Sequence, residues 1–357
     1  METIKYLLSG IDTLECGYYL ENRANSEFFL VIGATKELLR ETKSKNPKPV
    51  ELDDMEFLLE PYGSGSGYPF ILSNREYRIQ CGEFNNPSFF VKYNSEALWK
   101  HTAQGLHEKF TLWAASQGFE AFKAEGLSRV DFSFDYHIPE IDFTEKNIVT
   151  MSSKDSIHRE NNKVQTYTFG KGDVVLRIYD KVAEIHQSSH KEWFFDLWGV
   201  KENVWRIEWQ VRRNTLKRFG IRTMTDLAKR KKALLEWLSG QHDILRIPSE
   251  DSNKSRWPTH PLWIDIQKQI ANLPDEDIGK SVDENASINS REAQIMRSIY
   301  GYYKRVAAIM SAKGKHRYPS LGETMERVRL KLGLIHDPMT WDIDIATKTS
   351  EIELGKW

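Results

Sequence analysis

The chain has 357 residues, of which 40% are hydrophobic and 12% aromatic, so it can bury a large core in about two domains. Its formal net charge is −1, and overall basicity therefore gives no sign of a nucleic-acid partner. The first residues lack a basic-then-apolar leader pattern, no apolar run approaches ~18 residues, and the two cysteines lack metal-binding spacing. We expect a cytoplasmic protein with no membrane partner.

In the first third of the chain, turn-forming segments separate short apolar stretches. The Gly/Ser-rich loop at 63–67 lacks the Gly-Lys-Ser/Thr ending of a phosphate-binding P-loop, so we interpret it as a flexible turn. Ser95 is a suitable N-cap for an amphipathic helix that ends near Gly118. The remaining patterns predict a short helix at 34–43 and strands near 14–20, 27–32, 77–81 and 89–93.

Three later stretches, near 129–135, 176–181 and 205–212, alternate strictly between apolar and polar residues. This alternation is typical of half-buried strands, because successive side chains of a strand point to opposite faces. The polar side chains are Arg129, Asp131, Ser133, Asp135, Arg177, Tyr179, Arg206, Glu208, Gln210 and Arg212. If the strands are neighbours, these side chains form a functional site on one surface; the alternative is a set of ordinary cross-strand ion pairs.

The rest of the chain is predicted to be polar, then helical. A polar segment at 138–163 precedes a strand at 165–169, and the turn at 171–173 predicts a hairpin with the strand that follows. Helical patterns then dominate, with Ser290 as an N-cap and polar linkers at 248–255 and 275–289. The predicted helices lie near 224–238, 261–271, 290–312 and 321–332.

Two stretches of the second half are locally basic. From Arg206 to Lys232, ten Lys or Arg residues face two acidic ones, and from Arg291 to Lys331 ten face three. Local patches of this kind attract phosphates even when net charge is near zero. Two solvated, basic helix faces would give the same composition.

Tyr179 has the most distinctive surroundings in the sequence. Arg177 and Lys181 flank it at two residues on either side, and nearby cations favour the nucleophilic phenolate. A phenolate attacks phosphorus well if a divalent metal withdraws charge from the phosphate. Mg²⁺ and Mn²⁺ prefer oxygen ligands. The candidate ligands are Asp131, Asp135, Glu184 and Glu208.

The order of four short motifs resembles the replication initiation factor family. The motifs are Ser-Arg-Val-Asp at 128–131, Thr-Phe-Gly at 168–170, Leu-Arg-Ile-Tyr-Asp-Lys-x-x-Glu at 176–184, and Trp-Arg-Ile-Glu at 205–208. That family comprises rolling-circle replication initiators of small plasmids, relaxases of some conjugative elements and initiators of certain filamentous phages. The resemblance covers roughly residues 14–219, and size and element order are most similar to the phage members. The His-hydrophobic-His metal motif of the better-known nickase superfamily is absent.

The resemblance assigns roles to individual residues. The family's tyrosine cleaves one DNA strand and stays linked to its 5′ phosphate; here it is Tyr179, supported by Arg177, Lys181 and Glu184. Asp131 and Glu208 match family acidic positions, and we expect them to bind Mg or Mn, with Asp135 as a further candidate ligand. The expected DNA contacts are Arg129, Arg206, Arg212, Arg213, Lys229, Arg230, Lys231 and Lys232.

The expected fold is α+β. A catalytic domain at 1–218, with a central antiparallel sheet covered by helices, would precede a helical, basic region at 219–357 for DNA binding or oligomerisation. Expected partners are origin DNA, duplex and single-stranded, and a host helicase and polymerase, because the sequence contains no Walker motif; a homodimer is left open. The alternatives are a conjugative relaxase of the same family and a non-catalytic DNA-binding regulator. A carboxylate-pair glycosidase is a third, which would need neither Tyr179 nor basic patches.

Overall fold

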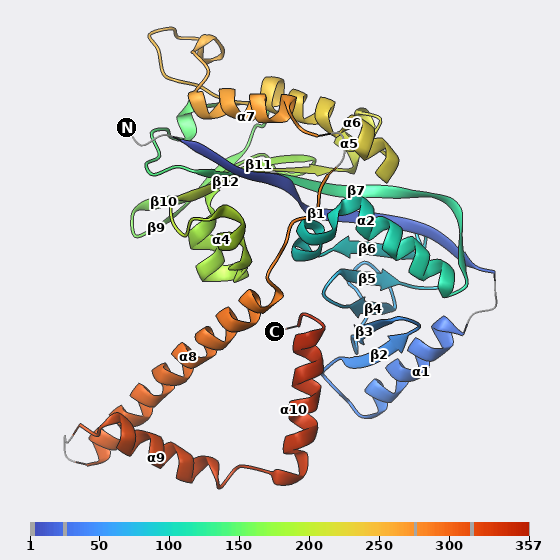
Figure 1. Cartoon of the computed structure of the whole chain (residues 1–357), viewed down its shortest axis with the longest axis vertical. Coiled ribbons are helices and arrows are strands. Elements are labelled where there is room, and N and C mark those ends of the chain that lie inside the picture. The colour runs from blue at the N-terminus through green and yellow to red at the C-terminus, as the bar shows by residue number, and fades with distance from the viewer. Residues whose placement is uncertain (1–3, 24–26, 275–276, 315–317, 357) are drawn as a thin grey trace.

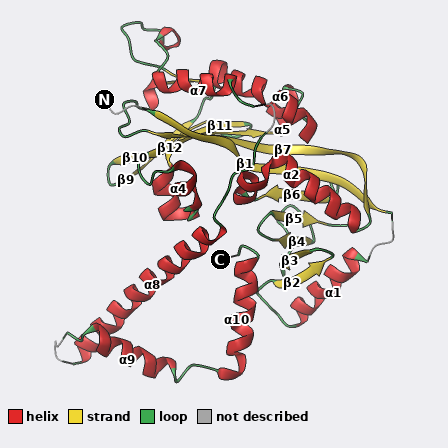
Figure 2. Cartoon of the chain, in the orientation of Figure 1, coloured by secondary structure: helices red, strands yellow, loops and turns green. Residues whose placement is uncertain are grey.

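The computed structural model describes residues 4–23, 27–274, 277–314 and 318–356. They form one eleven-stranded antiparallel sheet, a two-stranded sheet, and helices on both sides of the large sheet (Figure 1; Figure 2). The strand order of the large sheet is β2-β3-β4-β5-β6-β1-β7-β12-β11-β10-β9, and β13 pairs with β8. The predicted α+β class with a helical C-terminal region is confirmed.

The strands vary widely in length, and β1 and β7 are much the longest. Their bounds are β1 Lys5–Asn22, β2 Lys48–Leu52, β3 Met55–Leu59, β4 Phe70–Ser73, β5 Tyr77–Cys81, β6 Phe89–Tyr93, β7 Phe119–His137, β8 Ile148–Thr150, β9 Asp155–Glu160, β10 Lys163–Phe169, β11 Val174–Asp180, β12 Val204–Arg212 and β13 Asp243–Leu245. Because β1 and β7 pair along almost their whole length, they join the β2–β6 half of the sheet to the β9–β12 half.

The helices lie between and after these strands. Their bounds are α1 Phe28–Glu41, α2 Ser95–Ser116, α3 Lys181–Glu184, α4 Trp193–Trp198, α5 Arg213–Arg218, α6 Met224–Trp237, α7 Pro261–Ala271, α8 Glu284–Lys313, α9 Leu321–Leu332 and α10 Pro338–Glu353. Among the described residues, no helix is long and apolar enough to cross a membrane.

The apolar face of the sheet carries the main core. Val130, Phe132 and Ile207 pack in one cluster with Leu234 of α6 and Trp263 of α7, and all five are buried. The core therefore continues past residue 219 without a break, into α6 and α7. The division of the chain at residues 218 and 219 stays a prediction.

A smaller cluster lies on the opposite face of the sheet. Trp193, Phe194 and Trp198 of α4 pack with Trp99 of α2. Trp99 also lies against β1, with its ring 2.8 Å from the position that a Cβ would take at Gly10. A larger residue at position 10 would displace the indole, so Gly10 allows α2 and α4 to meet over the sheet.

The helices α8, α9 and α10 form an arm that leaves the sheet domain and returns to it (Figure 1). Where the arm returns, the carbonyl of Glu353 at the end of α10 accepts a hydrogen bond from Arg75 Nε at 2.6 Å. The end of α10 therefore contacts the turn between β4 and β5, which contains Arg75. Large apolar side chains are exposed on all three helices, including Tyr302, Leu332 and Met339. The described arm residues therefore contribute little to the core.

Several predicted element boundaries were wrong. The stretch 27–32 is not a strand but the start of α1, because Phe28, Ile32 and Leu39 recur at helical spacing and face the core. α2 has Asn94 as its N-cap, while the Ser95 hydroxyl hydrogen-bonds to Asp12.

The later segments also differ from expectation. The polar segment 138–163 contains β8 and β9, and α10 was not predicted. α8 begins after Asp283, which caps it, so Ser290 lies inside the helix and part of the predicted linker at 275–289 is helical. Residues 275–276 of that linker, and Lys315 and Arg317 of the second basic stretch, lie outside the described residues.

Candidate active site

The three alternating strands predicted from the sequence are neighbours in the sheet. β12 lies between β7 and β11, with Arg206 opposite Asp135 on one side and Tyr179 on the other. Two residues further along β12, Glu208 lies opposite Ser133 on β7 and Arg177 on β11. Because paired residues share a face, the polar side chains gather on one surface. We call this surface of β7, β11 and β12 the polar face.

Tyr179 and Glu208 are hydrogen-bonded on the polar face. The Tyr179 hydroxyl donates to Glu208 Oε2 at 3.0 Å. Arg177 donates from Nη1 to Glu208 Oε1 at 3.1 Å and from Nη2 to Gln210 Oε1 at 3.1 Å. One carboxylate oxygen is therefore oriented by an arginine, and the other faces the phenol.

The electrostatics of Tyr179 differ from the sequence-based expectation. Burial raises the pKa of the Tyr179 phenol well above 10, and the Glu208 carboxylate raises it further, whereas Arg206 opposes the rise. Tyr179 is thus a neutral phenol held against a base. Arg177, expected to stabilise the phenolate directly, instead binds Glu208 and Gln210.

Lys181 is buried immediately after the strand that carries Tyr179. Asp180 caps α3 by accepting from the Ala183 amide, so the strand ends one residue after the tyrosine. The Lys181 ammonium lies 2.5 Å from Glu184 Oε2 and 5.6 Å from the Tyr179 ring centroid. Burial, with Arg206 and Lys191 nearby, lowers the pKa of Lys181 to about 8.

Next to Tyr179 in the sheet, Arg206 and Asp135 form a buried ion network. Arg206 donates from Nε and Nη2 to Asp135 at 2.6 and 2.8 Å, and Trp198 donates to the same carboxylate at 2.9 Å. Arg206 Nη1 lies 3.0 Å from Asp12 Oδ1, and Phe194 covers the guanidinium. Arg206 and Asp135 are 0% exposed, so Arg206 cannot reach DNA and Asp135 does not fit a metal-ligand role.

Asp12 is the site residue that sequence reasoning missed. β1 has a bulge between Ile11 and Thr13, where its register with β7 shifts and Asp12 is the extra residue. Because of this bulge, Asp12 reaches the polar face, as Thr13 does. Its carboxylate also accepts from Ser95 Oγ at 2.8 Å. Although burial opposes ionisation, Lys191 and the buried Arg206 hold the pKa of Asp12 well below its usual range.

Asp131 lies further along the polar face, opposite Gln210, and its side chain is buried. Arg129 donates from Nε to Asp131 Oδ1 at 2.8 Å. Burial raises the pKa of the Asp131 carboxyl to about 6, the Arg129 hydrogen bond opposes this rise, and the nearby Glu208 adds to it. Two carboxylates, Asp131 and Glu208, therefore repel each other on one surface.

The fit of these carboxylates to a divalent metal is partial. Among the described residues, no three His, Cys, Asp or Glu side chains are grouped closely enough to hold a metal ion. Asp131 and Glu208 are the carboxylates of this surface with the oxygen chemistry that Mg²⁺ or Mn²⁺ prefers. Arg129 binds both oxygens of Asp131, and Arg177 and Tyr179 each bind one oxygen of Glu208.

The basic side chains expected to bind DNA are not on one surface. Arg129 is on the polar face, and Arg212 and Arg213 are exposed where β12 ends and α5 begins. The remaining four are on α6, which packs on the apolar face, on the opposite side of the sheet from α4 (Figure 1). Of these, Lys229, Arg230 and Lys232 are exposed, whereas Lys231 is buried and its ammonium lies 2.6 Å from Asp277.

Comparisons with known proteins give one structural similarity. No protein-family model matches the chain, and no curated protein matches it in sequence. Among solved structures, the chain is similar to the rolling circle replication initiator protein from Geobacillus stearothermophilus, with a TM-score of 0.45 and 16% sequence identity. The aligned region covers 77% of this chain and 99% of that chain.

Proposed function

We propose that the protein initiates rolling-circle DNA replication as a site-specific, single-strand endonuclease and strand transferase, with Tyr179 as its nucleophile. The observation that carries this proposal is the Tyr179–Glu208 hydrogen bond on the polar face. The resemblance of the motif at 176–184 to the replication initiation factor family also supports it.

Glu208 acts as the general base in this mechanism. Because the phenol is neutral at pH 7, its proton must leave as the oxygen attacks, and Glu208 Oε2 already accepts that proton's hydrogen bond. The Tyr179 oxygen forms a bond to phosphorus while the P–O3′ bond breaks. The Tyr179 oxygen gives its proton to Glu208 and takes the phosphoryl group, and the departing 3′ oxygen gains a proton.

The remaining side chains position these groups. Arg177 holds Glu208 in place through one carboxylate oxygen, which leaves the other directed at Tyr179. Of the cations near Tyr179, Arg177 is the more accessible, at 32% exposed, whereas Lys181 is buried and paired with Glu184. The products are a 5′ phosphotyrosine and a free 3′-hydroxyl. A host polymerase can extend this hydroxyl while a host helicase unwinds the duplex. Since one phosphodiester replaces another, no ATP is required.

Asp131 and Glu208 would hold Mg²⁺ or Mn²⁺ in this site. When bound, the metal supplies Lewis-acid polarisation of the phosphate oxygens. Glu208 would then be both the base for Tyr179 and a metal ligand, and these two roles are separable by experiment.

The test is incubation with single-stranded origin DNA and Mg²⁺ or Mn²⁺, followed by denaturing electrophoresis for a covalent protein–DNA adduct. Tyr179→Phe removes one oxygen and leaves the ring packed, so we expect it to bind DNA but form no adduct. A Tyr179→Phe adduct would assign the nucleophile elsewhere. DNA binding by the wild type without any adduct would instead favour a non-catalytic DNA-binding regulator.

A further inference from the structure

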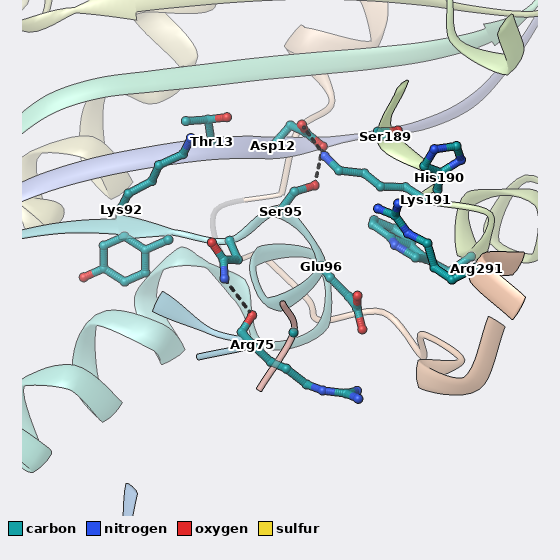
Figure 3. Close-up of a pocket in the computed structure, with 14 residues that line it drawn as sticks. Asp12, Thr13, Arg75, Lys92, Ser95, Glu96, Ser189, His190, Lys191 and Arg291 are labelled. Carbon is teal, nitrogen blue, oxygen red and sulfur yellow. Dashed lines mark hydrogen bonds and ion pairs between the residues drawn. The ribbon is translucent and has the colours of Figure 1, made fainter. Parts of the chain in front are cut away.

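A cavity of about 370 Å³ opens beside Asp12 and Thr13 of β1 (Figure 3). Because Thr13 pairs with Asp131 of the polar face, the cavity is on the same side of the sheet as that face. Segments far apart in the sequence line it: β1, the β4–β5 turn, the end of β6 and start of α2, the segment before α4, and both ends of the arm. Thr13 and Asp12 lie at its base, with Lys92 on one side and Lys191 and Arg291 on the other.

The charge of the lining is positive. Arg75, Lys92, Lys191 and Arg291 face it, against Asp12 and Glu96. Asp12 is already neutralised by the buried Arg206 and by Lys191, at 3.0 and 3.5 Å. Four cations and two carboxylates thus line the cavity, a balance that favours an anion.

Lys92 is the cation best placed to meet that anion. Its side chain is exposed and makes no hydrogen bond or ion pair with any described residue. Glu15 lies directly opposite it in the sheet, but the Glu15 carboxylate lies 3.7 Å from Arg129 instead. At the other side of the cavity, His190 has a left-handed backbone (φ 53°), a conformation that non-glycine residues seldom adopt.

The register of the sheet connects the cavity to Tyr179. Thr13, in the cavity, pairs with Asp131, which pairs with Gln210, and Gln210 bonds to Arg177 beside Tyr179. Crossing these three strand spacings takes about 14 Å, and Tyr179 lies opposite Arg206, four residues or about 13 Å further along the strand. The direct path from Thr13 to Tyr179 is therefore roughly 19 Å, a span that a few nucleotides of single strand can bridge. The volume suits one nucleotide and excludes a duplex.

We propose that this cavity binds a phosphate-bearing nucleotide of the single DNA strand a few positions from the bond that Tyr179 attacks. The inference rests on the proposed function, because it takes the strand on the polar face as given. Lys92 binds the phosphate, and the strand reaches Tyr179 over Thr13 and Asp131.

The experiment measures binding of homothymidine oligonucleotides of increasing length to full-length protein carrying Tyr179→Phe, which prevents cleavage. We expect affinity to rise in a step at the length that reaches the cavity. Lys92→Gln should remove that step, with about a tenfold loss of affinity for the long oligonucleotides, and lower the salt slope by about 0.7. Lys92→Arg should restore both.

Lys48→Gln is the matched control, because Lys48 is an exposed lysine on the edge strand β2, at the far end of the sheet. It should keep the step. If Lys92→Gln binds every length as Lys48→Gln does, the strand does not enter the cavity and the inference is overturned while the proposed function stands. If no length binds to the Tyr179→Phe protein, both are overturned. A step abolished by inorganic phosphate at matched ionic strength would mean that the cavity selects free phosphate over the strand.

Discussion

Two neighbouring rows of the polar face are built from the same residue types but have different surroundings. In one row, Arg206 and Asp135 are fully enclosed under α4, and all their strong contacts are with each other, Asp12 and Trp198. In the next row, Arg177 pairs with Glu208 beside the half-buried Tyr179, and the Arg177 side chain is 32% exposed. Whether an arginine–carboxylate pair on this face is enclosed or accessible therefore depends on what covers it.

The largest expected effect comes from breaking the buried pair. Arg206→Leu leaves Asp135 and Asp12 without their main cation, and such an uncompensated buried charge costs about 3–5 kcal/mol of unfolding free energy. Arg177→Leu should cost less, about 1–2 kcal/mol, because Arg177 is partly exposed and Glu208 keeps the Tyr179 hydroxyl as a partner. Urea denaturation of both variants checks the difference. Equal losses would mean that burial does not distinguish the two pairs.

The second prediction separates the two roles of Glu208. Glu208→Gln keeps the shape and an acceptor for the Tyr179 hydroxyl but removes the base, so adduct formation should slow about 10²–10³-fold with little change in stability. If Glu208 acts chiefly as a base, raising the Mg²⁺ concentration should not restore the rate. Full recovery at high Mg²⁺ would assign Glu208 to metal binding alone. Asp131→Asn, the matched carboxylate variant, should be the one that added metal rescues.

The third prediction uses the raised pKa of Asp131. Because the folded state raises the pKa to about 6, it binds a proton more tightly than the unfolded chain does. Stability should therefore fall by about 1–3 kcal/mol as pH rises from about 4 to about 6. Asp131→Asn should lack this fall, in urea titrations at each pH. Mn²⁺ should raise the melting temperature of the wild type only above pH 6, where the metal ion no longer competes with a proton for the Asp131 carboxylate. A thermal shift that survives in Asp131→Asn would exclude this carboxylate as a ligand.

The smallest expected effect concerns α6, on the far side of the sheet. Replacing the exposed Lys229, Arg230 and Lys232 together by Gln should lower the salt slope of duplex binding by up to roughly 3 units if each cation neutralises a phosphate. Lys231→Gln is the internal control: its ammonium is paired with Asp277, so the slope should not change. An unchanged slope in the triple variant would make this run a solvated helix face and leave duplex binding to other basic residues.

Much of the polar face could be predicted from sequence because alternation is a local signal. The period of two in 129–135 and 205–212 places Asp131 and Glu208 each on the polar side of its own strand. That the two strands are neighbours comes from the fold. Lys231 could also have been placed correctly, because it follows Leu227 by four residues and precedes Leu234 by three, so it must share the core-facing side of α6.

Other parts of the site have no local signal. Asp12 reaches Arg206 only because of a bulge in β1 and a contact between residues nearly two hundred positions apart. The cover supplied by Trp198 and Phe194 likewise depends on how α4 packs, so the sequence could not reveal which arginine would be enclosed. Burial by distant segments, rather than residue type, decides these roles.

The long β1–β7 pairing also sets the order in which the protein can fold. Lys5 pairs with His137, and His137 pairs with Val204, so the centre of the sheet joins segments separated by many residues. Contacts between such distant segments make folding slow, because long loops must close before any pairing forms. During synthesis, β7 lacks its second neighbour until β12 has emerged. The tyrosine strand β11, which pairs with β12, is therefore among the last parts of the sheet to be completed.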